Sequence, residues 1–567
     1  MKRTLLIFII LLSIIGVPAG SFAADPSQGS SPSRSAAGYE SLTTYELGDM
    51  LVEQAQAICQ KRLSRGELCE VLNAGQETPN FLNTTAREGF ALLLTFVTDL
   101  AHSYHKNPYL GMRPEMDGIS VKLDKYLSKQ ENNKGAIFLR YALGLVMEKY
   151  NLNPDKLVLE LVDAALGAVY PAPPRILPQT ETIVNAYLNK AILGNQTPVV
   201  KFDLFATEGT SAAFTYLFNS MKTNKLIRPG DQIAVVTPIY APYLDLPAMS
   251  EFNLTVVKLQ GDPKKGWQLS DAEIDKLKDS RIKVLVLANP GNPTGVSLDM
   301  GVMVRIAELV KTVRRDLIII TDTGEADFVD NYVSLFKHIP ENTIGIHSYS
   351  KYFGVPGWHL VLIIINPTNV IDRLISRLPE GDRSELAKRY QWKSLDLDKV
   401  KFIDRMVLDS RDVALSYKGG LSGPQQAVMC LFSIFDLMDT DHTYKKSVQN
   451  LLNERHTQLY GGLGLPPTPQ QPGQTLLYTL IDIKNLAQTT YGEDFAKYLT
   501  QTSLIDFLLR LARDYSTVCL PAKGFAGPEW TIRISLVNLN PEEYKKIGSH
   551  IKETLQTMHN EWPDKQK

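Results

Sequence analysis

The segment from His347 to Leu360, HSYSKYFGVPGWHL, contains a lysine that could carry out covalent chemistry. Lys351 follows the residues Ser-Tyr-Ser and precedes a run rich in aromatic residues and glycine. A lysine amine forms a Schiff base with an aldehyde when its surroundings favour the neutral amine. A lone lysine in a loop is usually only solvated, so the other motifs of the chain decide between these two interpretations.

A carboxylate stands in a second position that could carry chemistry. Asp322 comes at the end of the apolar run LIIITD. A carboxylate at the end of a buried strand is costly unless it has a partner. A protonated pyridine nitrogen is one suitable partner, and a helix N-cap or a core salt bridge is the alternative.

Two further segments could hold a ligand. Gly209, Thr210 and Ser211 precede an apolar helical stretch, where free backbone N–H groups and two hydroxyls can bind a phosphate. An ordinary N-cap is the simpler interpretation of that stretch taken alone. The segment ANPGNPTGVS, 288–297, directly follows a predicted strand, and its prolines and glycines fix a loop that presents Asn292.

The elements that must position these groups are predicted by apolar runs in the middle of the chain. Four such runs are nearly continuous: Gln232–Pro238, Ile282–Pro290, Leu317–Thr323 and Leu360–Asn366. Runs of this kind are typical of strands buried on both faces of a parallel sheet. Amphipathic segments alternate with them, which indicates a doubly wound α/β domain. In such a sheet, ligands bind at the carboxyl ends of the strands.

Together these motifs resemble the fold-type I pyridoxal-phosphate enzymes of the aspartate aminotransferase superfamily, class I/II. The family's order is kept: the phosphate cradle, TPIYAPY, NPGNPTG, the strand-end aspartate, SYSK and then TIRISLVN. The longer stretches NTTAREGFALL and GPEWTIRISLVNLN are similar to the aspartate 4-decarboxylase branch, which also transaminates aspartate. The resemblance spans 41–541. It implies a three-layer fold with a mostly parallel central sheet, plus a smaller α+β domain from the N- and C-terminal segments.

The resemblance also implies a role for each matching residue. Lys351 would form the Schiff base with pyridoxal 5′-phosphate and move the substrate proton, and Asp322 would keep the pyridine nitrogen protonated. Tyr240 would stack on the ring, Asn292 would bind its 3-oxygen, and Arg533 would clamp the substrate α-carboxylate. The phosphate would be bound by a set of small residues: Gly209, Thr210, Ser211 and Ser348.

Three positions depart from the family's pattern. His359 stands where an arginine pairs with the phosphate, and Glu325 where a tyrosine usually donates to the 3-oxygen. Gln76 replaces the arginine of the branch's AGRGNPNW motif, which is expected near the substrate. We retain all three as candidate cofactor or substrate residues. A histidine is charged only when it is protonated, so we expect phosphate binding to weaken about ten- to a hundredfold.

The resemblance implies an enzyme that converts L-aspartate to L-alanine and CO2, with aspartate aminotransferase activity. The enzyme would bind a small acidic amino acid and a 2-oxo acid. It would form a homodimer or a larger assembly of dimers. The departures leave two alternatives: a degenerate relative kept for binding or assembly, or another pyridoxal-phosphate reaction. A net charge of −1 does not produce the positive electrostatic field that would attract nucleic acid. The sequence also shows no spacing of cysteines and histidines typical of a metal site.

The first residues differ in kind from the rest. Lys2 and Arg3 precede an apolar run, Leu5–Val17, and a small-residue cleavage site near Ala23. This layout is typical of a secretory signal peptide, 1–23. An uncleaved anchor is the alternative, but the run is shorter than the roughly 20 residues that span a bilayer. We therefore expect an exported, periplasmic protein without a membrane contact after cleavage.

Composition predicts the remaining organisation. We expect a disordered linker at 24–40, the N-terminal part of the smaller domain at 41–150, the large domain at 151–425 with a helical insertion at 379–420, and the rest of the smaller domain at 426–567.

The four cysteines are Cys59, Cys69, Cys430 and Cys519. Export permits disulfides, and a local bridge between Cys59 and Cys69 is one interpretation. We expect instead that all four are free, buried thiols.

Overall fold

The protein is described by a computed structural model that covers residues 39, 42–194, 199–413 and 419–562. The predicted signal peptide, 1–23, and the linker apart from Tyr39 lie outside the described residues. The described residues from Leu42 onward form one compact unit.

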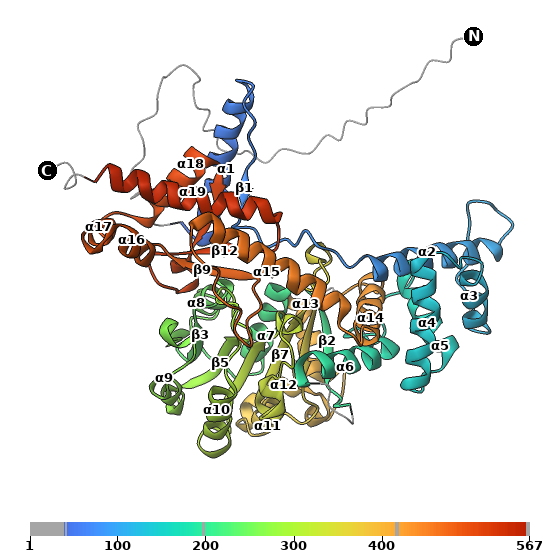
Figure 1. Cartoon of the computed structure of the whole chain (residues 1–567). Helices are drawn as coiled ribbons and strands as arrows, with labels where there is room; N and C mark the ends of the chain where they lie inside the picture. The colour runs from blue at the N-terminus through green and yellow to red at the C-terminus, as the bar shows by residue number, and fades with distance from the viewer. Residues whose placement is uncertain (1–38, 40–41, 195–198, 414–418, 563–567) are drawn as a thin grey trace, which may run out of the picture. The chain divides into compact units, whose positions relative to one another are not determined.

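A seven-stranded sheet forms the centre of the large domain (Figure 1). The strand order is β2-β8-β7-β6-β5-β3-β4. The strands are β2 (Asp203–Glu208), β3 (Gln232–Thr237), β4 (Thr255–Gln260), β5 (Ile282–Ala288), β6 (Ile318–Asp322), β7 (Thr343–Ser348) and β8 (Leu360–Ile365). All four apolar runs form strands, and the predicted α/β fold with a mostly parallel sheet is confirmed.

One strand differs from the expectation. The run that became β8 was expected to be parallel, but β8 is antiparallel to both β7 and β2. The physical reason is the connection from β7, which contains only the short 3-10 helix η7 (Pro356–Trp358). A parallel return needs a crossover of a dozen or more residues, usually a helix. The chain between Tyr349 and His359, which carries Lys351, returns directly instead.

Apolar side chains cover both faces of this sheet, as the continuous runs predict. In β5, Val284 and Val286 belong to one core cluster, and Leu285 and Leu287 to the other, because successive side chains alternate across a strand. The first cluster includes α7 (Thr210–Thr223), and the second includes α10 (Met300–Thr312). These helices form the outer layers and fix the sheet between them.

The predicted helical insertion at 379–420 contributes to the first of these cores. Its helices are α12 (Glu380–Tyr390) and α13 (Phe402–Val413), and α13 packs against α7 and β2. Tyr390, Phe402 and Met406 are buried in the same cluster as the sheet. The described part of this segment is therefore built into the domain.

The smaller domain joins the two ends of the chain. Its antiparallel sheet has the order β11-β12-β9, and the two-residue strand β1 pairs in parallel with β10. The strands are β1 (Leu72–Asn73), β9 (Tyr478–Asp482), β10 (Thr517–Val518), β11 (Leu520–Pro521) and β12 (Thr531–Ser535). Above the large sheet in Figure 1 lie α1 (Thr44–Leu63), α15 (Thr443–Leu463), α16 (Ile483–Tyr491), α17 (Glu493–Leu499), α18 (Leu504–Tyr515) and α19 (Pro541–Asn560).

A second helical group lies beside the large domain (Figure 1). It comprises α2 (Thr84–Ser103), α3 (Ile119–Leu127), α4 (Lys134–Lys149) and α5 (Pro154–Leu166). Helices α14 (Gly423–Met438) and α6 (Pro178–Leu193) connect this group with the large domain, because α14 packs against α2, α6 and β8. Helices α2 and α4 pack against each other and against α14. Within the predicted segment 41–150, α1 packs against α18 and β1 pairs with β10, whereas α2 and α4 pack against α14 and α3 packs against α5.

The expectation of four free thiols is wrong for one pair. Cys59 and Cys69 form a disulfide, with Cα atoms 5.3 Å apart. Helix α1 ends at Leu63 and the chain reverses at Gly66, which has a φ of 79°, so that Cys69 returns beside Cys59. Cys430 and Cys519 are free and buried.

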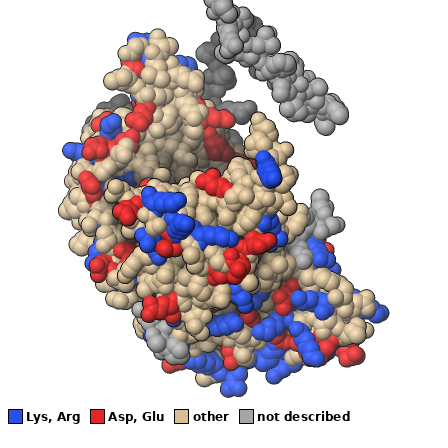
Figure 2. Space-filling model, turned by 90° about the vertical axis from the view of Figure 1, so that its right-hand side faces the viewer, with Lys and Arg blue, Asp and Glu red and all other residues tan. Residues whose placement is uncertain are grey.

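Acidic and basic side chains are interspersed on the face shown in Figure 2. This mixture agrees with the near-zero net charge of the chain. Among the described residues, no helix is both long and apolar enough to cross a bilayer.

Candidate active site

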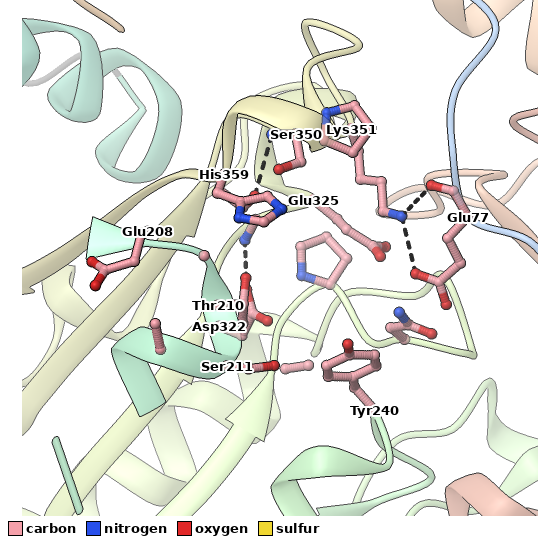
Figure 3. Close-up of a pocket in the computed structure, with 18 residues that line it drawn as sticks. Glu77, Glu208, Thr210, Ser211, Tyr240, Asp322, Glu325, Ser350, Lys351 and His359 are labelled. Carbon is pink, nitrogen blue, oxygen red and sulfur yellow. Dashed lines mark hydrogen bonds and ion pairs between the residues drawn. The ribbon is translucent and has the colours of Figure 1, made fainter. Parts of the chain in front are cut away.

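A cavity of about 320 Å³ lies at the carboxyl ends of the parallel strands (Figure 3). Its volume falls within the usual range for small-molecule sites. It is lined by ten of the residues predicted to hold the cofactor: Gly209, Thr210, Ser211, Tyr240, Asn292, Asp322, Glu325, Ser348, Lys351 and His359. Segments separated by up to 150 residues of chain therefore meet in one place, as the sheet topology requires.

Lys351 and Asp322 are brought together by two neighbouring strands. Asp322 ends β6 and is paired in register with Ile346 of β7. Lys351 follows the end of β7 by three residues. Because the two strands are parallel, their carboxyl ends meet at the same edge of the sheet, and both side chains line the cavity.

The N-terminus of α7 lies at one end of this cavity. Its N-cap is Gly209, with a φ of 111° and no side-chain capping bond, so the first N–H groups of the helix keep their capacity to donate. His359 lies over this end, because a Cβ placed on Gly209 would be 3.8 Å from the Cβ of His359. The hydroxyl of Ser348 accepts a hydrogen bond from the N–H of Ser350 at 3.2 Å.

A carboxylate beside this helix end would repel a phosphate unless it were already engaged. Glu208 lines the same cavity. However, its Oε1 accepts a hydrogen bond from the hydroxyl of Tyr216, and its Oε2 accepts one from the N–H of Gly420 at 2.9 Å. Figure 3 shows the carboxylate directed away from the cavity centre. The helix end thus remains suited to an anion.

At the other end, Asp322 is held by two donors. The hydroxyl of Tyr243 donates to Oδ2 at 2.7 Å, and the N–H of Gly324 donates to Oδ1 at 2.8 Å. Burial raises the pKa of Asp322, and these two hydrogen bonds oppose that effect. Burial lowers the pKa of His347 to about 4, so His347 is neutral behind Asp322 at neutral pH.

Tyr240 and Asn292 line the cavity between these two ends. Tyr240 follows β3, and the ring of Tyr45 from α1 lies edge-on to it with centroids 6.4 Å apart. The Nδ2 of Asn292 donates to the hydroxyl of Tyr478 at 3.2 Å. The Oδ1 of Asn292 is buried and has no hydrogen-bond partner among the described residues. A polar atom left in this state on a cavity wall indicates an absent ligand or water.

Sequence reasoning missed the residue that closes the site. Glu77, from the loop between β1 and α2, points into the cavity (Figure 3). Its Oε1 pairs with Nη1 of Arg533, and its Oε2 accepts hydrogen bonds from Nζ of Lys351 at 3.0 Å and from the hydroxyl of Tyr478 at 3.1 Å. Its backbone carbonyl also accepts from Lys351. Burial alone would raise the pKa of Glu77, but Lys351 and Arg533 hold it well below its usual range.

A signal for Glu77 was present in the sequence. In the motif AGRGNPNW, a glycine stands at the position that Glu77 occupies, directly after the arginine replaced by Gln76. The structure places Gln76 outside the cavity lining, exposed, with its Nε2 donating to Thr78 at 3.3 Å. The assignment of Gln76 to substrate binding therefore stays a prediction without a contact to support it.

Arg533 lies behind Glu77. Its side chain is 1% exposed, and its guanidinium group packs over the rings of Phe525 and Tyr478. Its Nη2 donates to the carbonyl of Gly75 at 2.8 Å. Arg533 thus lies beside the cavity and is paired with a carboxylate of the chain itself, and its role as a substrate clamp stays a prediction.

Glu325 occupies the position of the family's tyrosine donor. It is buried, and its Oε2 has no hydrogen-bond partner within the described part of the chain. Burial raises the pKa of Glu325 well above its usual range, and the carboxylates of Glu77 and Asp322 raise it further. A protonated carboxyl can donate a hydrogen bond, as a tyrosine hydroxyl does. In that form the side chain carries no negative charge that would repel an oxygen of the cofactor.

The donor set fits pyridoxal phosphate. One cavity combines an uncapped helix terminus for a phosphate, a buried carboxylate for a ring nitrogen, an aromatic side chain and an amine. Together with the mixed seven-stranded sheet, this site defines a fold-type I pyridoxal-phosphate enzyme.

The chain belongs to the family of class I and II aminotransferases, whose family model matches residues 172–551. It is 38% identical over 525 residues to a bifunctional aspartate aminotransferase and L-aspartate beta-decarboxylase from a Pseudomonas species, a match that covers 92% of this chain and 97% of that protein. Enzymes of this family depend on pyridoxal phosphate, so the predicted superfamily, cofactor and enzyme class are confirmed.

Solved structures share the fold. An aspartate aminotransferase from Rhizobium meliloti matches with a TM-score of 0.54 at 13% identity, covering 89% of this chain and 96% of that one. An aromatic aminotransferase from Pyrococcus horikoshii matches with a TM-score of 0.52 at 15% identity, covering 88% and 98%. At these identities the likeness concerns the fold alone.

Proposed function

We propose that this protein is an exported enzyme that converts L-aspartate to L-alanine and CO2 and also transaminates aspartate with a 2-oxo acid. The observation that carries the proposal is the meeting of Lys351 and Asp322 in one cavity with an anion-binding helix end. The choice of aspartate is supported by the relative that matches 97% of its own length.

Several residues would hold the cofactor. The N–H groups at the start of α7, with the hydroxyls of Thr210 and Ser211, would bind the phosphate, and His359 would face it. Asp322 would accept a hydrogen bond from the ring nitrogen, and Asn292 would bind the 3-oxygen. When bound, the cofactor supplies a protonated ring that accepts the electron pair of a bond broken at the substrate.

The other groups act on the substrate. Lys351 is the one lysine that lines the cavity within the described chain, so its Nζ is the group that would take the proton from Cα and return it. Arg533 would orient the α-carboxylate through two parallel hydrogen bonds. The rings of Tyr240 and Tyr478 would exclude water from the reacting carbon.

Product analysis separates the two outcomes. Loss of the side-chain carboxylate as CO2 leaves alanine, whereas loss of the amino group leaves oxaloacetate. The test incubates the purified protein with pyridoxal phosphate, aspartate and 2-oxoglutarate, and measures alanine, CO2 and oxaloacetate. Formation of alanine with an equal amount of CO2, absent in Lys351→Ala, supports the decarboxylase. Oxaloacetate and glutamate alone would restrict the proposal to transamination.

A catalytically degenerate protein is the second candidate, and one observation favours it. Glu77 holds both Lys351 and Arg533, the two cations that the reaction requires. A protein that stays colourless with saturating cofactor and forms no product would support this candidate and refute the enzyme.

Export and assembly belong to the same proposal. Export is supported by the signal-peptide pattern at 1–23 and by the Cys59–Cys69 disulfide, which persists in oxidising compartments. Recovery of the protein from the periplasm with a mature N-terminus near Ala24 tests it. A homodimer, or a larger assembly of dimers, follows from the resemblance, and light scattering of the mature protein measures it.

A further inference from the structure

The pairing of Glu77 with Arg533 has the form of a bound substrate carboxylate. Both cations that would contact a substrate, Lys351 and Arg533, donate to Glu77, and the hydroxyl of Tyr478 completes its surroundings. Arg533 is 1% exposed, and the described residues offer it no other carboxylate. A buried guanidinium group requires a partner, so the subsite on Arg533 is filled by the protein itself.

The backbone of the loop that carries Glu77 is held on both sides of that residue. On one side, the carbonyl of Ala74 accepts from the N–H of Ser535 at 2.8 Å. On the other, the N–H of Asn80 donates to the carbonyl of Val537 at 3.0 Å. The backbone is thus anchored to β12 and its extension, while the side chain of Glu77, at 20% exposure, has a route to solvent.

We propose that Glu77 is a specificity-determining residue that occupies the carboxylate subsite on Arg533 until a substrate displaces it. The inference rests on the proposed function, in which Arg533 binds the α-carboxylate. A ligand with a carboxylate at the reacting carbon must compete with Glu77. A primary amine without that carboxylate meets no such competition, because the Glu77–Arg533 pair can stay intact while it reacts.

The electrostatics of the cavity sharpen this selection. The Glu77 carboxylate lies close enough to Glu325 to raise the pKa of that group, whose Oε2 is buried without a partner within the described chain. A second substrate carboxylate would meet both of these acidic groups. Among the residues that line the cavity, the basic side chains are only those of Lys351 and His359. Removal of the charge on Glu77 should therefore strengthen carboxylate binding in general and dicarboxylate binding most.

The first experiment measures binding without cofactor or turnover. Calorimetry of the cofactor-free protein with succinate, a dicarboxylate that cannot react, compares the wild type with Glu77→Gln. We expect Glu77→Gln to bind succinate at least tenfold more tightly, because one charge-assisted contact no longer has to be displaced. Glu529→Gln is the matched control, because Glu529 is an exposed glutamate on the same domain. The Glu529→Gln variant should bind succinate with the same affinity as the wild type.

A second variant keeps the test valid if Glu77→Gln does not fold. Glu77→Asp preserves the negative charge but shortens the reach to Arg533, and we expect it to bind succinate at least threefold more tightly than the wild type. Equal or weaker binding of succinate by the folded variant would overturn the inference.

Kinetics with the loaded enzyme separate this inference from the proposed function. Glu77→Gln should lower KM for aspartate at least tenfold and leave the KM of n-butylamine, measured by the change in cofactor absorbance, within twofold. Tighter succinate binding in a protein that never turns over aspartate would support the inference and refute the proposed function. Normal aspartate turnover with succinate affinity unaffected by Glu77→Gln would refute the inference alone.

Discussion

The hydroxyl of Tyr243 donates to Oδ2 of Asp322 at 2.7 Å, at the bottom of the cavity that Lys351 lines. With the N–H of Gly324, it fixes the carboxylate in one orientation. A buried carboxylate held in this way is suited to keep a ring nitrogen protonated, and only one of its oxygens needs to face the ring. The chemical role of the site therefore depends on the charge of Asp322 as well as on its position.

The first prediction concerns that charge. Asp322→Asn has nearly the same shape but cannot stabilise a protonated ring nitrogen. We expect cofactor absorbance to be retained, because the phosphate contacts and Lys351 are intact, while aspartate turnover falls by about a hundredfold or more. Steady-state kinetics and a cofactor titration measure the two effects. Turnover within threefold of the wild type would show that Asp322 has no role in the chemistry.

The second prediction concerns the phosphate. His359 lies over the N-terminus of α7, where the family has an arginine. His359→Arg supplies a permanent cation, so affinity for pyridoxal phosphate should rise about ten- to a hundredfold. Pyridoxal, which lacks the phosphate, is the matched control and should bind both proteins equally. An equal gain for pyridoxal would place the effect elsewhere in the site.

The third prediction concerns pH and stability. Burial lowers the pKa of His347 to about 4, so its neutral form is favoured in the folded protein. The contribution of His347 to the free energy of unfolding is therefore complete above the pKa of an ordinary histidine, near 6.5. It is lost progressively as the pH falls from there to 4, because the unfolded chain takes up the proton first. Between pH 7.5 and 4, the free energy of unfolding of the wild type should fall by about 3 kcal/mol more than that of His347→Gln.

Urea unfolding at several pH values provides this comparison. Asp327, whose pKa burial raises to about 6, titrates in the same window and lies 3.4 Å from His347. It is present in both proteins, so much of its contribution cancels in the difference. A difference that does not change with pH would contradict the neutral assignment of His347.

The fourth prediction concerns the disulfide. Cys59 and Cys69 are separated by ten residues. A bridge over this separation lowers the conformational entropy of the unfolded chain, which stabilises the folded state by about 3 kcal/mol. Cys59→Ser with Cys69→Ser should lower the free energy of unfolding by about that amount. Thiol titration of the denatured protein should find two groups without reductant, Cys430 and Cys519, and four after reduction. Four thiols without reductant would show that the bridge is absent.

Much of the fold and the cofactor end of the site followed from local sequence. The apolar runs predict strands because burial on both faces requires continuous apolar side chains. The candidate residues Gly209, Asn292, Asp322 and Lys351 could be found because each lies at, or within a few residues of, the end of a strand or the start of a helix. The topology of a parallel sheet determines where such residues lie.

The substrate end could not be predicted in the same way. The contact of Glu77 with Arg533 depends on the two-residue pairing of β1 with β10 and on long-range contacts to β12, which leave no periodic pattern. Tyr243 gave no signal because its partner, Asp322, is 79 residues away. The direction of β8 depended on the absence of a crossover helix before it, and an apolar run carries no information on direction.

The central claim is that Lys351 reacts with pyridoxal phosphate in the cavity that it lines together with Asp322. The most direct measurement adds pyridoxal phosphate to the purified protein, records the visible spectrum, reduces with borohydride and maps the modified peptide by mass spectrometry. The account predicts a visible band that is missing in Lys351→Ala and a cofactor fixed to the peptide that contains Lys351. A colourless wild type at saturating cofactor, or a band of equal strength in Lys351→Ala, would contradict it.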